Sequence, residues 1–166
     1  MFLILGLLVA CDTQEESAKD QVIVVPKHVS PQKDDFEKKS FYCCSDASLQ
    51  PLMESYLKLT ETLANDDTKN AATHAQEFLS LAETQPSLQK ESTSLKPLWT
   101  EMDTIRSTLS DISTQMIELA KKQKSEKGTK IAVAFCPMAP GRWLQTRDEV
   151  HNPYYGSKML KCGVFE

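Results

Sequence analysis

The sequence lacks the motifs on which most common enzyme mechanisms depend. It contains no Gly-rich phosphate loop, no His-Glu-x-x-His pattern, no Gly-x-Ser-x-Gly turn and no Cys-x-x-Cys redox pair. A dyad of Cys136 or Cys162 with His151 or His74 is the remaining arrangement for nucleophilic catalysis, but no neighbouring residue lowers the thiol pKa of either cysteine in an evident way. We therefore expect that the chain is not an enzyme.

A strongly basic region is also missing. The formal net charge of the 166-residue chain is −4 at pH 7, so we expect no nucleic-acid partner. A chain of this length can form one domain with a modest hydrophobic core.

Long apolar runs are absent as well. The run Phe2–Ala10 is too short to span a bilayer as a helix but suits the hydrophobic region of a signal peptide. The segment Leu8–Cys11 resembles a bacterial lipobox, in which a cysteine that follows small residues is lipidated and becomes the mature N-terminus, although the usual preceding basic residues are missing. We predict a lipoprotein signal peptide at residues 1–10 and a membrane anchor through lipid on Cys11.

Asp12 refines the predicted location. An aspartate directly after the lipidated cysteine resembles the inner-membrane retention signal of enteric-type bacteria. We therefore predict a lipid-anchored protein of the bacterial cell envelope that faces the periplasm, with the inner membrane favoured.

Residues 11–44 are predicted to form a flexible tether. The segment is rich in Asp, Glu, Lys, Gln and Ser, contains Pro26 and Pro31, and has one short β-prone stretch, Val22–Val25. It cannot bury enough apolar area to offset the entropy of ordering.

Residues 45–128 carry apolar side chains at helical spacing. The pattern predicts a first helix from Ser45 to about Ala64, a second one that Pro86 closes, and a third one from about Pro97 to Gly128. Three or four antiparallel helices of this size form a bundle. The predicted fold class is therefore mainly α, an antiparallel three- or four-helix bundle with a small C-terminal β-hairpin and loop subdomain.

Residues 129–166 change to a strand pattern. Apolar residues alternate along Thr129–Phe135, which is typical of a half-buried strand. Gly163–Phe165 can pair back onto this strand, and that pairing would bring Cys136 and Cys162 together. We expect this Cys/Met hairpin to pack on the bundle as part of the same domain.

The C-terminal motifs resemble a known family. The pattern comprises Phe135-Cys136-Pro137-Met138-Ala139, then Gly141-x-Trp143-Leu144, then Asn152-Pro153-Tyr154-Tyr155-Gly156-Ser157-x-Met159-Leu160-x-Cys162-Gly163. It is similar to a bacterial exported domain family of undefined function that occurs as small lipoproteins and on periplasmic adaptor subunits of heavy-metal efflux pumps. The similarity is tight over about residues 131–164 and looser over the helices, where Arg106, Leu109-Ser110 and Leu119 fit the pattern.

The resemblance implies a helical domain with a Cys/Met hairpin in a metal-handling setting, and it supplies no demonstrated activity. It implies a heavy-metal efflux adaptor or a periplasmic metal carrier as partner.

The four sulfur residues of the hairpin allow two interpretations. In the first, Cys136, Met138, Met159 and Cys162 bind one Cu(I), because thiolate and thioether sulfurs select this soft ion, and His151 is close enough in sequence to add an imidazole. In the second, Cys136 and Cys162 form a disulfide worth about 3 kcal/mol, and both methionines are packing residues. The copper interpretation predicts a Cu(I)- or heavy-metal-binding lipoprotein of metal efflux or homeostasis. The disulfide interpretation predicts a disulfide-stapled helical adaptor for protein–protein interaction in the cell envelope, without metal.

Two further features stay open from the sequence. Cys43-Cys44 can add ligands, bond to the C-terminal cysteines or stay as thiols, and a disulfide within the pair would be strained. Trp143, Tyr154 and Tyr155 would suit partner docking if exposed, and are equally suited to a core.

Overall fold

The computed structural model describes residues 31–166. The predicted signal peptide, the lipidation site Cys11 and Asp12 lie outside the described residues. The described helices are α1 (Pro31–Lys39), α2 (Gln50–Ala64), α3 (Thr68–Ala82), α4 (Gln89–Leu95), α5 (Met102–Lys122) and the short 3-10 helix η1 (Gly156–Lys158). The described strands are β1 (Phe41–Cys43), β2 (Lys124–Ser125), β3 (Thr129–Phe135), β4 (Arg142–Gln145) and β5 (Val164–Phe165).

The predicted fold class is wrong. In the part of the chain that the structure describes, a five-stranded antiparallel sheet stands beside five α-helices, so the fold is mixed and is not a helical bundle with a small hairpin. The error has a physical cause, because β1 and β2 are very short and join the sheet only through long-range pairing, β1 with β3 and β2 with β1. Their local sequence carries no strand periodicity that could have indicated this.

Strand β3 organises the sheet. Its first half pairs antiparallel with β1, in the register Phe41 to Ile131. Its second half lies between β4 and β5, because Phe135 is opposite Arg142 on one side and Val164 on the other. The predicted strand Thr129–Phe135 is confirmed, as is the return of the last residues onto it.

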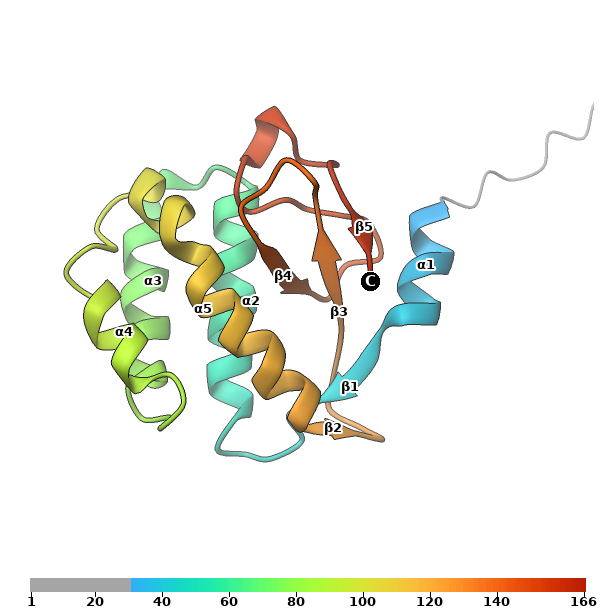
Figure 1. Cartoon of the computed structure of the whole chain (residues 1–166), viewed down its shortest axis with the longest axis horizontal. Coiled ribbons are helices and arrows are strands. Elements are labelled where there is room, and N and C mark those ends of the chain that lie inside the picture. Colours follow the sequence, from blue (N-terminus) through green and yellow to red (C-terminus); the bar gives the residue numbers. More distant parts are fainter. Residues whose placement is uncertain (1–30) are drawn as a thin grey trace, which may run out of the picture.

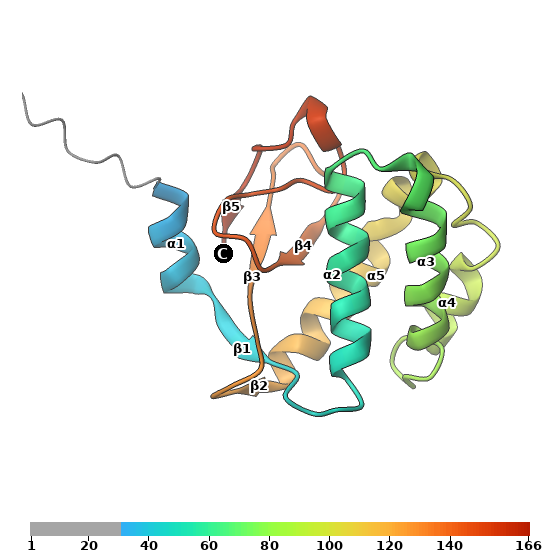
Figure 2. The same cartoon turned by 180° about the vertical axis from the view of Figure 1, so that it is seen from behind.

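The helices form layers around this sheet. Helices α2 and α5 lie against β4, and α3 and α4 lie beyond them, farther from the sheet (Figure 1). Helix α1 is at the opposite side of the domain, next to β5 (Figure 2). Within residues 31–166, none of the helices combines the length and the apolar character needed to cross a membrane.

The three long helices follow from apolar periodicity, as predicted. Asp67 caps the N-terminus of α3 by accepting a hydrogen bond from the backbone N–H of Asn70 at 3.3 Å, which satisfies an otherwise free donor. Helix α5 buries one stripe, and its last turn carries Lys121 and Lys122, where positive charge complements the helix dipole. Helix α4, seven residues long, was not predicted as a separate element.

Residues 31–44 belong to the folded domain and not to a tether. Phe36 of α1 is buried and meets Phe165 of β5 edge to face, with ring centroids 5.3 Å apart. The Lys39 ammonium also donates a hydrogen bond to the carbonyl of Phe165 at 2.5 Å. Cys43 and Cys44 are buried as well. The folded domain therefore includes a segment that composition alone marked as linker.

The core between α2, α3, α5 and the sheet is largely apolar. Tyr56 is fully buried, and its hydroxyl is 2.7 Å from the hydroxyl of Ser113 on α5. Its ring packs edge to face against Phe78 of α3, which in turn stacks on Trp99. These contacts fix the helices against β4 and thereby position the C-terminal segment.

Candidate functional site

The two C-terminal cysteines are joined. Cys136 follows β3 and Cys162 precedes β5, and they form a disulfide with their α-carbons 5.6 Å apart. Cys136 is fully buried and Cys162 is half-buried. With both sulfurs bonded to each other, neither is a thiolate ligand in this state, and neither can serve in the Cys–His dyad considered above.

The two methionines lie in turns that the disulfide connects. The backbone N–H of Ala139 donates to the carbonyl of Cys136 at 2.9 Å, which closes a turn containing Met138. The N–H of Cys162 donates to the carbonyl of Met159, also at 2.9 Å. Met138 is 65% exposed, whereas Met159 is half-buried against the core. The structure thus brings two sulfur-bearing turns side by side through the S–S bond.

Asn152 ties the segment between them into a compact loop, which we call the C-terminal loop (residues 152–162). Asn152 is fully buried. Its backbone N–H donates to the carbonyl of Leu160, and its side-chain N–H donates to the carbonyl of Cys162 at 3.3 Å. Its side-chain oxygen accepts the N–H of Tyr154, as is typical of an Asx turn. The Asn-Pro-Tyr-Tyr pattern therefore encodes a self-supported loop.

A second set of contacts anchors the C-terminal loop to the helices, and we call it the loop clamp (Arg106 and Asp66 with Pro153 and Ser157). Arg106 of α5 donates from Nε to the carbonyl of Pro153 at 3.0 Å, and its Nη2 contacts Asp66 Oδ1 at 2.6 Å. The other carboxylate oxygen of Asp66 accepts the backbone N–H of Ser157 at 2.8 Å. Hydrogen bonds from Ser157 and from Arg106 lower the pKa of Asp66 to about 2.

Gly156 is required by the loop clamp. Its φ of +55° is in the left-handed region, and a Cβ there would lie 2.0 Å from Asp66 Oδ1 and 2.4 Å from Arg106 Nη2. Only glycine lets the backbone approach an ion pair this closely. Asp66 itself was not predicted, because the turn that carries it is far from the C-terminal motif in sequence.

The aromatic residues of the motif have different environments. Trp143 is fully buried and Tyr154 is 5% exposed, with their rings 6.0 Å apart and edge to face. The Tyr154 hydroxyl donates to the carbonyl of Arg142 at 3.1 Å. Tyr155 is half-buried and its hydroxyl donates to the carbonyl of Met138. Trp143 and Tyr154 are thus core residues, and Tyr155 alone of the three reaches the surface.

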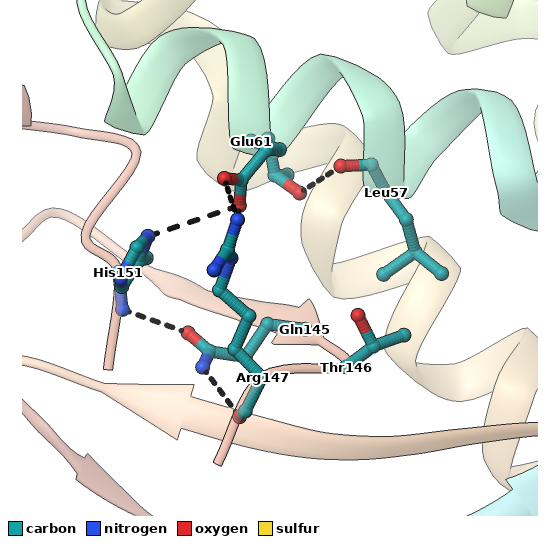
Figure 3. Close-up of a pocket in the computed structure, with 7 residues that line it drawn as sticks. Leu57, Glu61, Gln145, Thr146, Arg147 and His151 are labelled. Atoms are coloured by element: carbon teal, nitrogen blue, oxygen red, sulfur yellow. Dashed lines mark hydrogen bonds and ion pairs between the residues drawn. The ribbon is translucent and has the colours of Figure 1, made fainter. Parts of the chain in front are cut away.

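Two hollows flank this region. The first, of about 290 Å³, lies between α5 and the C-terminal loop, and it is lined by Asp103, Arg106, Ser107, Pro140, Tyr154, Tyr155 and Lys158. The second, of about 230 Å³, lies between α2 and the segment after β4, and Figure 3 shows most of its lining residues.

A bidentate ion pair dominates the second hollow. Arg147 donates from Nε and Nη2 to the two carboxylate oxygens of Glu61, at 3.0 and 2.6 Å. Burial alone would raise the pKa of Glu61, but the hydrogen bonds from Arg147 and from Asn65 outweigh it, so the pKa is lowered. The pair holds the segment after β4 against α2.

His151 borders the same hollow (Figure 3). Its Nδ1 is buried, has no hydrogen-bond partner among residues 31–166 and lies 3.8 Å from Glu61 Oε2. Burial lowers the pKa of His151, and the Arg147 cation lowers it further, which outweighs the opposite effect of Glu61. The imidazole is therefore neutral at neutral pH. The sequence had named this position as an additional copper ligand and as a possible member of a Cys–His dyad.

The described residues offer no further cluster of metal-binding groups. Across residues 31–166, no three or more His, Cys, Asp or Glu side chains are grouped so that they could hold a metal ion. Comparison with protein-family models, with curated proteins and with solved structures gives no match to this chain.

Proposed function

We propose that this chain is a lipid-anchored binding module of the bacterial cell envelope, facing the periplasm, which recognises a protein partner through the surface around its disulfide. The observation that carries the proposal is the Cys136–Cys162 disulfide. A structural disulfide is typical of proteins that fold in an oxidising compartment such as the periplasm. By taking up both thiols, it also favours the adaptor interpretation over the metal carrier.

The surface around the disulfide has the composition of a docking site. Met138 is 65% exposed and stands beside Tyr155, whose hydroxyl bonds to the Met138 carbonyl. Pro140, Tyr155 and Lys158 line the hollow of about 290 Å³ next to it. We call Met138, Pro140, Tyr155 and Lys158 the docking face. Met and Tyr are enriched in protein interfaces, and the lysine supplies a positive charge for an acidic partner residue.

Two residues of the docking face, Tyr155 and Lys158, lie in the C-terminal loop. The disulfide, the hydrogen bonds of Asn152 and the loop clamp each hold the C-terminal loop in place. A preordered surface loses less entropy when it binds. The partner that we propose is a periplasmic adaptor subunit of a heavy-metal efflux pump, and the support for it is the motif resemblance alone.

Crosslinking in the cell envelope tests this proposal. A photoreactive amino acid at position 138 should crosslink the chain to one defined envelope protein, and Met138→Glu should weaken association with that protein. Leu98 is a matched control, because it is an apolar side chain 48% exposed in the turn between α4 and α5. Equal crosslinking from positions 138 and 98, or none from position 138, would contradict the docking face.

A second candidate function is Cu(I) binding by the reduced protein. The specific observation in its favour is that the disulfide connects the turns of Met138 and Met159, so that reduction would free two thiols in turns that also carry two thioethers. Oxidation would then switch the site off.

The two functions separate in one titration. A chain with Cys43→Ser and Cys44→Ser is reduced under anaerobic conditions and titrated with Cu(I). The carrier function expects one Cu(I) per chain, a large loss of affinity in Cys136→Ser and a smaller one in Met159→Ala. No uptake after complete reduction would leave the adaptor function alone.

A further inference from the structure

A second pair of sulfurs lies at the opposite end of β3. Cys43 ends β1 and Cys44 follows it, both are buried, and both are free thiols. Interaction between the two thiols lowers the pKa of Cys44, and together with burial it raises the pKa of Cys43. The fold thus contains a dithiol that the proposed function does not use.

The backbone holds this pair in a fixed position. Cys43 is paired on both sides, with Lys124 of β2 and with Thr129 of β3. The N–H of Cys44 donates to the carbonyl of Gln123 at the end of α5, at 3.2 Å. Cys44 has a φ of +61°, which is uncommon for a residue other than glycine. These contacts hold the backbone of both cysteines in place.

The pair is suited to remain reduced. Adjacent α-carbons across a trans peptide are about 3.8 Å apart, which is below the usual range of about 4.4–6.8 Å for disulfides. The described part of the chain has no cis peptide bond. Conditions that form the Cys136–Cys162 bond therefore leave Cys43 and Cys44 as thiols.

A hollow lies next to the backbone of the pair. It has a volume of about 330 Å³ and is lined by Ser45, Gln50, Lys127, Gly128 and Thr129. Gly128 packs directly on this backbone, since a Cβ there would lie 2.3 Å from the Cys43 carbonyl oxygen and 3.3 Å from the Ser45 nitrogen. The turn between β2 and β3 is therefore packed against the backbone of the dithiol.

We infer that Cys43 and Cys44 form a binding site for trivalent arsenicals of the type R–As(OH)₂. Two thiols on adjacent residues suit a pyramidal centre that bonds both sulfurs on one side better than a linear S–Cu–S arrangement, which needs the sulfurs on opposite sides of the ion. In the reaction, two As–S bonds form and two As–O bonds break. Both thiol protons leave with the oxygens as two molecules of water, and no atom changes oxidation state.

The experiment uses the oxidised, folded chain and phenylarsine oxide as the probe. We expect one adduct per chain in native mass spectrometry, an unchanged Cys136–Cys162 disulfide, and fragment masses that place the phenylarsenic bridge on Cys43 and Cys44. Cys44→Ala should lose the adduct, whereas Cys136→Ala with Cys162→Ala should keep it.

The rate of the reaction provides the check that does not depend on a variant. Phenylarsine oxide should react with the wild-type chain faster than the chain unfolds globally, as judged by hydrogen exchange of core amides under the same conditions. No adduct, a bridge between other residues, or a reaction that proceeds only at the rate of global unfolding would overturn the inference.

Discussion

Removal of the Cys136–Cys162 disulfide should lower the stability of the whole domain by a calculable amount. The cysteines are 26 positions apart, and the entropy of closing a loop of that length in the unfolded chain corresponds to about 3.5 kcal/mol at 25 °C. A domain the size of residues 31–166 unfolds with an entropy that converts this loss into a decrease in Tm of about 12 °C. The disulfide connects the segments next to β3 and β5, which also pair with each other, so its removal need not change the native contacts.

Thermal unfolding followed by circular dichroism measures this effect. The wild-type chain is compared in the oxidised form, in the presence of a strong reductant, and as the variant with Cys136→Ala and Cys162→Ala. The variant should not respond to the reductant, which controls for effects on Cys43 and Cys44. If the oxidised and reduced wild-type chains unfold at the same temperature, the entropic argument for a stapling role is refuted.

Three further predictions follow from buried or charged contacts. Gly156→Ala should destabilise the domain by about 2 kcal/mol, because the new Cβ would collide with the loop clamp. Urea unfolding measures this loss, and wild-type stability in the variant would refute the role of the clamp. Stability should fall as pH decreases from about 4 towards 2, because the native pKa of Asp66 is about 2 and lies below its unfolded value. Asp66→Asn should flatten this part of the profile of Tm against pH. An unaltered profile in this variant would contradict the role of Asp66 in acid stability. Tyr56→Phe should cost about 1–2 kcal/mol, since it leaves the buried Ser113 hydroxyl without its partner, and the double variant with Ser113→Ala should cost less than the sum of the two single changes.

The pH profile should also report His151. Its native pKa is lowered by burial, so the unfolded chain takes up a proton first as pH falls below about 6.5. That difference reduces stability at mildly acidic pH, and His151→Gln should remove this component, as measured by Tm between pH 7 and pH 5.

The long helices were predictable because their signal is local. Helices α2, α3 and α5 each bury one stripe at helical spacing, and β3 shows the alternation of a strand. Such patterns are read within a single window of sequence. The same holds for the return of Val164 and Phe165 onto β3, which two nearby turn signals made geometrically simple.

The elements that were missed depend on distant partners. Helix α1 is polar and contributes Phe36 to the core only because β5 lies beneath it, and β1 is a strand only because Thr129–Ile131 is beside it. The same limit applied to the candidate site. The cysteine pair was visible in the sequence, but Asp66 joins the loop clamp only through Arg106 and Gly156, which lie far along the chain.

The position of β3 between early and late segments constrains the order in which the domain can fold. The β3–β4 hairpin and the α2–α3 pair join neighbouring stretches of the chain and can form first. The pairing of Phe41 with Ile131 closes a much longer loop, and long-range closure is slow. We expect α1 and β1 to dock last in refolding, onto a nucleus that is already formed, so the segment nearest the proposed membrane anchor would be the first to detach under mechanical load.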